Sequence, residues 1–252
     1  MQLFKRILPP AELPPDTPER RRSPRFAVNP EFPLQVRLAV VWRDEQGEAM
    51  GDEKAGWLWK GRLVDCSEDG ARIRFPGEVY AGPGDACDLR LALEDFELEV
   101  PCTISNLRHE GGGAVFGLRH TIHDERTWHA YAQFLEVISF GATLRPQFKK
   151  PQWHSGYLME QYAGERQSCL NVWRQRANKA VAPFEFRLRE SIVRAALGQE
   201  LEYYTGEEIA AARRASEART AEIHRLFRWV VPNLAPVVPQ DVRKFLRRYT
   251  GS

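Results

Sequence analysis

The chain has 252 residues, enough for one or two domains, and its 43% hydrophobic and 28% charged residues are ordinary for a soluble globular protein. The net charge of +2 conceals an asymmetry, because residues 1–144 carry 17 Lys+Arg against 23 Asp+Glu, whereas residues 145–252 carry 19 against 11. No apolar run approaches the roughly eighteen residues of a membrane span, the start lacks the apolar core of a signal peptide, and the cysteines form no Cys-x-x-Cys pair. We therefore expect a cytoplasmic protein with reduced thiols and no membrane span.

The N-terminal stretch joins a proline-rich leader, residues 1–18, to a cluster of arginines. Proline fixes φ and has no N–H to donate, so we expect the leader to be extended and weakly ordered. Directly after it come four arginines, at Arg20, Arg21, Arg22 and Arg25. A guanidinium stays charged, grips a phosphate or the O6/N7 edge of guanine with two bonds, and stacks on bases. The cluster favours a ligand that carries phosphate and purine, and a solvated basic patch is the simpler alternative.

Period-two alternation of apolar residues predicts a series of short strands between residues 34 and 120. Turn signals rich in proline and glycine, and a polar loop at 44–56, separate these strands. Many short strands with turns between them indicate a closed or nearly closed small barrel. The predicted strands cover residues 34–40, 57–64, 71–75, 87–93, 96–106 and 114–120.

A second motif, formed by Asp65, Ser67 and Gly70, lies in the tight link between two of these strands. Its carboxylate can accept hydrogen bonds from guanine N1–H and N2–H₂, and its hydroxyl can bond a phosphate or brace the turn. The glycine allows a positive φ or a close backbone approach to a ligand. The same pattern, Asp-x-Ser-x-x-Gly, is also a good turn sequence without any ligand.

After the last predicted strand, apolar residues recur at helical spacing at Trp128, Tyr131, Leu135 and Ile138. Asp124 precedes them as a candidate N-cap. We expect this helix to use its apolar stripe to close one mouth of the barrel.

Residues 145–252 change in character and are predicted to be mainly α-helical. A linker with prolines and basic residues covers 145–155, and residues 156–180 are compatible with a helix. The segment Phe184–Leu188 alternates like a strand but also fits a helix, so both assignments stay open here.

Two further helices are predicted toward the end of the chain. A capping box at Thr205–Glu208 predicts a long helix from residue 206 to about 231, and residues 240–249 form a short basic helix. Glutamates alternate with the arginines of the long helix, which favours a solvated face or helix packing over contact with nucleic acid or an anionic membrane. A protein partner is therefore the favoured ligand of this region, and nucleic acid is the less favoured one.

The two motifs together, Arg-x-x-x-Arg at Arg21 and Arg25 followed by Asp-x-Ser-x-x-Gly, resemble the PilZ domain, a bacterial receptor for the second messenger cyclic di-GMP. The resemblance covers residues 19–140 and includes Phe116-Gly117-Leu118-Arg119, which look like the family's last strand. It implies an α+β fold in which a small antiparallel β-barrel with a closing helix clasps the nucleotide against a flexible arm. The implied organisation is a leader at 1–18, a cyclic di-GMP-binding barrel at 19–144 and an output region at 145–252.

The resemblance also implies roles for individual residues. The ligand-binding residues would be Arg21, Arg25, Asp65, Ser67 and Gly70, joined by Arg20. An arginine at the place of Arg20 accompanies an intercalated pair of nucleotides in the family, so two cyclic di-GMP molecules per chain are expected. Auxiliary contacts would come from Arg22, Arg72, Arg74 and Arg119.

Other site chemistry finds little support in the sequence. His120, His123 and His129 could be taken for a metal cluster, but they need not share a face and no cysteine accompanies them, so surface and capping roles are favoured. No glycine precedes Ser67 to make a nucleophile elbow, and Walker and Rossmann glycine loops are missing. We therefore expect a receptor rather than an enzyme, with no metal and no cofactor besides the nucleotide ligand.

The expected function is that of a cyclic di-GMP receptor or effector. It would change conformation on binding the nucleotide and signal to a partner through its barrel surface or its C-terminal helices. Two alternatives stay open: a cyclic di-GMP-controlled DNA-binding regulator, and a PilZ adaptor that serves motility or polysaccharide-export machinery without the nucleotide. The intact arginine motif argues against nucleotide independence.

Overall fold

The chain divides into two compact units, residues 1–135 and 136–252. The division falls inside one helix, α2 (Glu125–Ala142). The computed structural model describes residues 23–40, 58–77, 81–148, 152–154, 156–196, 198–206 and 212–251. The predicted leader, the polar loop at 44–56 and the arginines Arg20, Arg21 and Arg22 lie outside the described residues.

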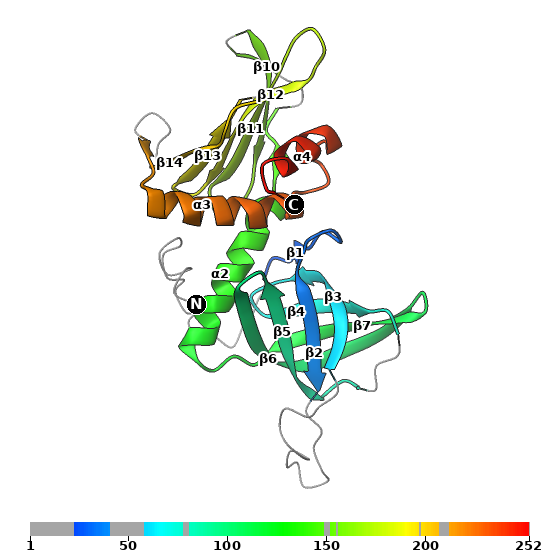
Figure 1. Ribbon diagram of the computed structural model, residues 1–252. Helices are drawn as coiled ribbons and strands as arrows, with labels where there is room; N and C mark the ends of the chain where they lie inside the picture. Colours follow the sequence, from blue (N-terminus) through cyan, green and yellow to red (C-terminus); the bar gives the residue numbers. More distant parts are fainter. Residues whose placement is uncertain are drawn as a thin grey trace. The chain divides into compact units, whose positions relative to one another are not determined.

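Six strands of the first unit close into an antiparallel barrel (Figure 1). The strands of this unit are β1 (Phe26–Ala27), β2 (Gln35–Val40), β3 (Leu58–Cys66), β4 (Gly70–Phe75), β5 (Ala86–Leu93), β6 (Phe96–Glu110) and β7 (Gly113–His120). They pair in the order β3-β2-β5-β6-β7-β4, and β3 also pairs with β4, which closes the ring. The short strand β1 pairs with β3 at its other edge. The predicted small barrel is therefore confirmed.

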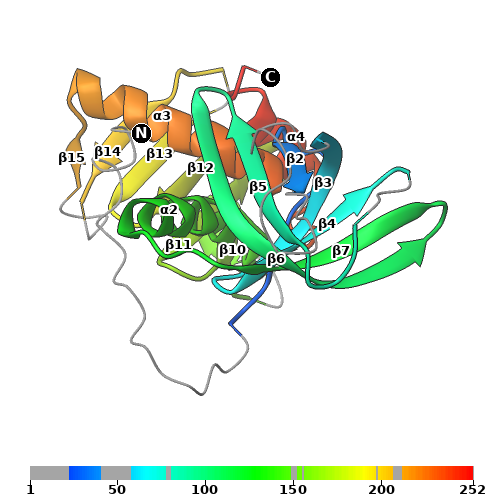
Figure 2. The same ribbon diagram turned by 90° about the horizontal axis from the view of Figure 1, so that it is seen from below.

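Alternation along the strands builds the barrel core. In β5, every second residue from Cys87 to Leu93 is buried, and the residues between them are partly exposed. Phe75 and Phe116 meet edge to face inside the barrel, with ring centroids 5.4 Å apart. Strands β6 and β7 form a hairpin that projects from the barrel in Figure 2. Its β6 side, from Ser105 to Glu110, is largely exposed, whereas Ala114 and Val115 on the β7 side are buried.

Helix α2 begins as its sequence predicts. The Asp124 carboxylate accepts a hydrogen bond from the backbone N–H of Thr127 at 2.7 Å, which satisfies one of the free donors of the first turn. Within the first unit, Tyr131 and Phe134 of this helix are buried, and Phe134 stacks on Phe96 of the barrel with centroids 6.1 Å apart. The predicted closing helix and its N-cap are confirmed.

The second unit contains an antiparallel sheet of eight strands (Figure 1). Its strands are β8 (Arg145–Pro146), β9 (Gln152–His154), β10 (Tyr157–Ala163), β11 (Ser168–Arg174), β12 (Val181–Leu188), β13 (Ser191–Ala195), β14 (Glu202–Thr205) and β15 (Arg213–Arg214). They follow the order β15-β14-β13-β12-β11-β10-β8, and β9 pairs with β10. The helices are α3 (Glu217–Val230), the 3₁₀ helix η2 (Val231–Asn233) and α4 (Gln240–Arg247).

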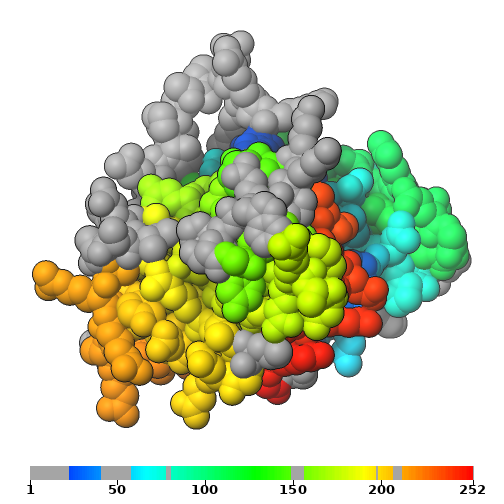
Figure 3. Space-filling view, turned by 90° about the horizontal axis from the view of Figure 1, so that it is seen from above, coloured from blue at the N-terminus to red at the C-terminus, as the bar shows by residue number. Residues whose placement is uncertain are grey.

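One face of this second sheet packs against helices of the same unit. Phe184 of β12 stacks on Phe227 of α3 with centroids 5.8 Å apart, and Phe186 meets the same ring edge-on at 6.4 Å. Phe184 also meets Phe245 of α4 edge-on. In the space-filling view, segments of the sheet coloured yellow-green and yellow reach the surface side by side (Figure 3).

The sheet corrects the prediction of a mainly α-helical region at 145–252. Most of the segment 156–180, which was predicted to be compatible with a helix, forms strands β10 and β11, and the ambiguous Phe184–Leu188 lies in strand β12. The long helix begins at Glu217, with Ser216 as its N-cap, rather than at residue 206. The short terminal helix is confirmed as α4.

The reason for this error lies in the turns. Arg166 and Gln167 before β11, Lys179 before β12 and Arg189 before β13 have positive φ values of 54°, 61°, 59° and 56°. Sequence rules expect glycine, asparagine or aspartate at such positions, so these hairpins carry weak turn signals. Cross-strand pairing then outweighs local helix propensity.

Among the described helices, none is long and apolar enough to cross a membrane.

Candidate functional site

Strand pairing brings the arm that follows the arginine cluster to the edge of β3. Phe26 pairs with Cys66 and Ala27 with Asp65. The backbone N–H of Val28 donates to the carbonyl of Val64 at 2.9 Å, and the Phe26 side chain is buried. This register lays the arm along the strand that leads into the predicted Asp-x-Ser-x-x-Gly turn.

Asp65 is the point at which the two motifs meet. Its carboxylate is 8% exposed and accepts hydrogen bonds from Arg25 Nη1 at 2.9 Å and from Arg72 Nη2. The two arginine side chains are 53% and 49% exposed. A buried carboxylate thus has two half-exposed cations beside it, so it can give up one of them without being left as an uncompensated buried charge.

A second contact holds the arm to the same turn. The Ser23 hydroxyl donates to the Asp69 carboxylate at 2.7 Å. Sequence reasoning missed both residues, because position 69 is a variable place in Asp-x-Ser-x-x-Gly and Ser23 lies between two arginines. No periodic signal marks either of them.

Ser67 and Gly70 shape the turn itself. The Ser67 N–H donates to the Gly70 carbonyl at 2.8 Å, and its hydroxyl lies 3.3 Å from the same oxygen. A Cβ built on Gly70 would lie 2.1 Å from the Leu118 carbonyl oxygen. The sequence offers two reasons for a glycine at position 70, a positive φ or a close backbone approach. The structure shows the close approach, and the backbone that Gly70 approaches belongs to strand β7.

His120 and Tyr131 hold the turn in place through hydrogen bonds to its backbone carbonyls. The Tyr131 hydroxyl donates to the Ser67 carbonyl at 2.8 Å, and His120 Nδ1 lies 3.1 Å from the Glu68 carbonyl, to which it donates. The two rings meet edge to face with centroids 4.4 Å apart. Burial lowers the pKa of His120 from 6.5 to about 4, so the imidazole is neutral at pH 7.

This arrangement corrects the surface or capping role predicted for His120. The side chain is buried, because His120 keeps the inward parity of Phe116 and Leu118 on β7. The alternation pattern could have revealed this. Tyr131 was correctly predicted as core, but its hydroxyl contact with the turn has no signature in the sequence.

The other predicted site residues fall into three groups. Arg119 is exposed and pairs with Gly70 across β4 and β7, so its backbone lies beside the turn. Arg74 is engaged elsewhere, since its guanidinium donates to Glu110 at 2.7 Å. Arg20, Arg21 and Arg22 lie outside the described residues.

The geometry suits an anionic ligand with hydrogen-bond donors of its own. Arg25 and Arg72 present half-exposed guanidinium groups that can form charge-assisted bonds to phosphate. Asp65 beside them can accept from ring N–H groups, as a guanine base offers. Among the described residues, no group of three His, Cys, Asp or Glu side chains could hold a metal ion.

Comparison with known proteins points to the same part of the chain. Residues 19–136 match the family model described as PilZ domain. A solved structure, the PilZ domain with c-di-GMP of YcgR from Escherichia coli, is 13% identical, and the match covers 46% of this chain and 89% of that one with a TM-score of 0.32. No curated protein matches the chain.

The sequence motifs, the closed barrel and the family match agree over the same residues. Membership of this family implies a receptor that binds cyclic di-GMP. The family match ends at residue 136, where the second unit begins. Residues 19–136 of this chain are a PilZ domain.

Proposed function

We propose that this chain is a cyclic di-GMP effector that changes conformation when the nucleotide binds and signals to a protein partner. The observation that carries the proposal is the 2.9 Å contact between Arg25 and Asp65. It joins the arm to the turn across 40 residues of sequence, so Arg25 of the first motif lies beside Asp65 of the second.

The proposed roles follow from charge and position. Arg21 and Arg25 hold phosphate and guanine, Asp65 and Ser67 hold the second side of the ligand, and Gly70 keeps the turn against β7. When the ligand arrives, Arg25 turns from Asp65 toward the phosphate. Arg72 stays on Asp65, which avoids the cost of a buried carboxylate without a partner.

Two nucleotides per chain are proposed, as an intercalated pair. A stacked pair concentrates four phosphate charges, and Arg20 adds one more cation next to the Arg-x-x-x-Arg motif. Arg20→Leu should lower the calorimetric stoichiometry from two to one while binding persists. A wild-type stoichiometry of one would contradict the pair and leave the receptor function standing.

Residues 19–144 are proposed as the receptor and residues 145–252 as the output region. Several charged groups of the second unit are paired within it: Arg219 bonds Glu190 and Glu222, and Arg174 bonds Glu160. Internal pairing supports a packed interaction module and a protein partner more than a DNA-binding surface. Affinity capture from bacterial lysate with and without cyclic di-GMP should show a partner whose recovery depends on the nucleotide.

The function is tested by calorimetric titration of the full chain with cyclic di-GMP, with GMP as the matched nucleotide. Saturable binding of cyclic di-GMP, much tighter than that of GMP, is expected because only the cyclic dinucleotide offers two phosphates and two guanines to one site. The absence of saturable binding to folded protein would contradict the proposed function.

A further inference from the structure

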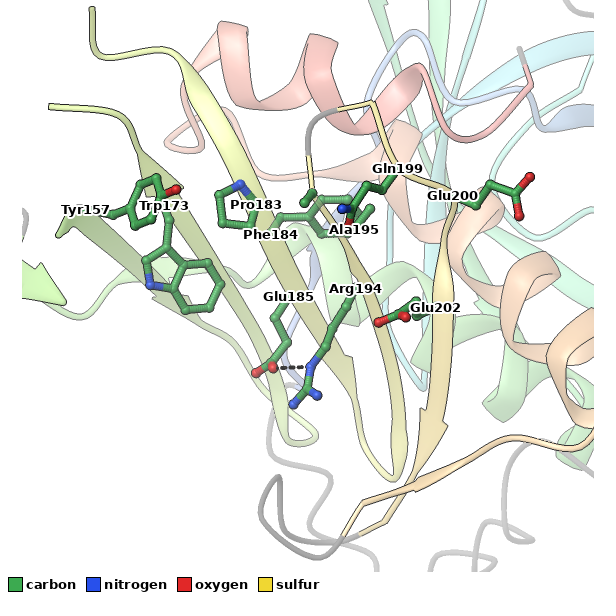
Figure 4. Close-up of a pocket in the computed structure, with 11 residues that line it drawn as sticks. Tyr157, Trp173, Pro183, Phe184, Glu185, Arg194, Ala195, Gln199, Glu200 and Glu202 are labelled. Atoms are coloured by element: carbon green, nitrogen blue, oxygen red, sulfur yellow. Dashed lines mark hydrogen bonds and ion pairs between the residues drawn. The ribbon is translucent and has the colours of Figure 1, made fainter. Parts of the chain in front are cut away.

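The face of the second sheet that is turned away from Phe227 carries a hollow of about 380 Å³. Strands β10 to β14 supply its walls, and Figure 4 shows its side chains gathered over β11, β12 and β13. The residues that the argument uses are Tyr157, Trp173, Pro183, Glu185, Arg194 and Glu202. No sequence motif points to this site, and the PilZ family match ends before it.

Strand alternation explains which side chains line this hollow. Phe184 packs on α3, so Pro183 and Glu185 next to it face the opposite side. Trp173 likewise precedes Arg174, whose guanidinium bonds Asp241 of α4 on the helix side. The register of β11 against β12 shifts between Val172 and Arg174, and such a bulge re-aims the side chain it carries.

The hollow is aromatic on one side. Tyr157 is 37% exposed, and Tyr157 and Trp173 both line this side of the hollow (Figure 4). Pro183 lies between these rings and the charged side chains, where it adds apolar surface. An indole and a phenol that share one concave surface attract cations through the negative faces of their rings.

The other side of the hollow has an excess of negative charge. Arg194 donates to Glu185 at 2.5 Å, and its guanidinium lies 4.9 Å from the Tyr204 ring centroid, so its charge is already matched. Glu202 accepts a hydrogen bond from Tyr204 at 3.0 Å. In the part of the chain that the structure describes, no lysine or arginine pairs with Glu200 or Glu202. Among the described residues, these two carboxylates therefore line the hollow without an ion pair, since Arg194, the cross-strand neighbour of Glu202, is bonded to Glu185.

We propose that this hollow binds a lysine or arginine side chain of a protein partner. The aliphatic stem of the basic side chain packs on Trp173 and Pro183, and its charge lies between the aromatic rings and Glu202. Cation–π attraction and carboxylate pairing act on the same group, which selects a basic side chain over an apolar one. The site belongs to the second unit alone and does not depend on nucleotide binding.

The test uses the full chain without nucleotide and three capped peptides, acetyl-Ala-Arg-Gly-Arg-Ala-amide and its lysine and glutamine counterparts. Peptide binding is followed by NMR through the indole N–H resonance of Trp173, which is assigned by its loss in Trp173→Phe. The arginine and lysine peptides should shift this resonance and bind about tenfold more tightly than the glutamine peptide. Added salt should weaken their binding.

Substitutions then separate cation–π attraction from carboxylate pairing. Because the Trp173 variants lack the indole resonance, calorimetry measures the affinity of the arginine peptide for every variant and for wild type. Trp173→Ala and Glu202→Gln should each weaken the arginine peptide by about threefold to thirtyfold, and Trp173→Phe should lose less because it keeps an aromatic face. Glu97→Gln, an exposed change on the barrel, should leave binding unchanged. Equal binding of the glutamine peptide would show a merely apolar groove and overturn the proposal, as would the absence of any Trp173 shift with the cationic peptides.

Discussion

The turn site of the barrel and the hollow of the second sheet share an arrangement of charged groups, but the ligands proposed for them have opposite charge. Each has a buried carboxylate on a strand, Asp65 in the first unit and Glu185 in the second, with an arginine bonded to it. Among the described residues, Asp65 pairs with two arginines, whereas Glu185 pairs with Arg194 alone.

That difference in charge balance decides which ligands the two sites select. At the turn of the barrel two arginines, Arg25 and Arg72, share the single carboxylate of Asp65, and we propose that this site favours phosphates. At the hollow the surplus is anionic and aromatic, so the site favours a basic side chain. In both sites the buried carboxylate and the arginine bonded to it fix the geometry. The other charged or aromatic side chains of the site determine which ligand it favours.

The largest effect is expected from the arginines of the arm. Arg21→Ala and Arg25→Ala should each remove contacts of about 1.5–3 kcal/mol and weaken cyclic di-GMP binding roughly ten- to a hundredfold, as calorimetry would measure. Arg108→Ala, an exposed arginine on β6, is the matched control and should bind normally. Peptide binding at the second sheet should not change. Wild-type nucleotide affinity in both variants would refute the site assignment.

The buried imidazole beneath the turn gives the barrel a pH dependence. Unfolded His120 titrates near 6.5 and folded His120 near 4, so its contribution to stability is complete above pH 6.5 and is lost as pH falls toward 4. The loss should reach about 3 kcal/mol. Denaturant unfolding at several pH values should show that the free energy of unfolding of His120→Gln lacks this part of the decline with falling pH. The exposed control His109→Gln should show the same decline as wild type. Parallel pH curves for wild type and His120→Gln would contradict the assignment.

Gly70→Ala tests the contact between the turn and β7. The new Cβ would lie 2.1 Å from the Leu118 carbonyl oxygen, so we expect a loss of about 1–3 kcal/mol in the free energy of unfolding and weaker nucleotide binding. Gly77→Ala is the control, because a Cβ there meets nothing within 4 Å. If the two variants are equally stable, the close approach is not what requires glycine at position 70.

The smallest expected effect on nucleotide affinity distinguishes Arg72 from Arg74, two arginines of strand β4. Arg72→Ala leaves Asp65 with Arg25 alone, so Arg25 is held back from the ligand and cyclic di-GMP binding should weaken by about threefold to tenfold. Arg74→Ala breaks only an exposed pair with Glu110 and should change affinity by less than about twofold. Equal effects would show that the second cation at Asp65 has no special role.

The sequence predicted the barrel well because its strands alternate cleanly and its turns carry glycine and proline. It also predicted that Asp65, Ser67 and Gly70 share a turn, since they are close in sequence. The family resemblance implied that the arm and the turn hold one ligand between them, but the direct contact between Arg25 and Asp65 was not predicted, because nothing local records that residues 40 apart will pair.

The second unit could not be predicted in the same way. Its hairpins turn at residues such as Gln167 and Lys179, which carry positive φ without the usual glycine. Its hollow depends on a register shift beside Trp173, and on Glu185 being neutralised across strands by Arg194. Both features arise from tertiary pairing, which leaves no local pattern in the sequence.

The central claim, that the arm and the turn clasp cyclic di-GMP between them, is tested most directly by residue-resolved amide exchange with and without the nucleotide. Exchange should slow at residues 20–25, while the Val28 amide, already bonded to the Val64 carbonyl, serves as an internal reference that changes little. Equal exchange at residues 20–25 in the two states, or slowing confined to the second unit, would contradict the claim.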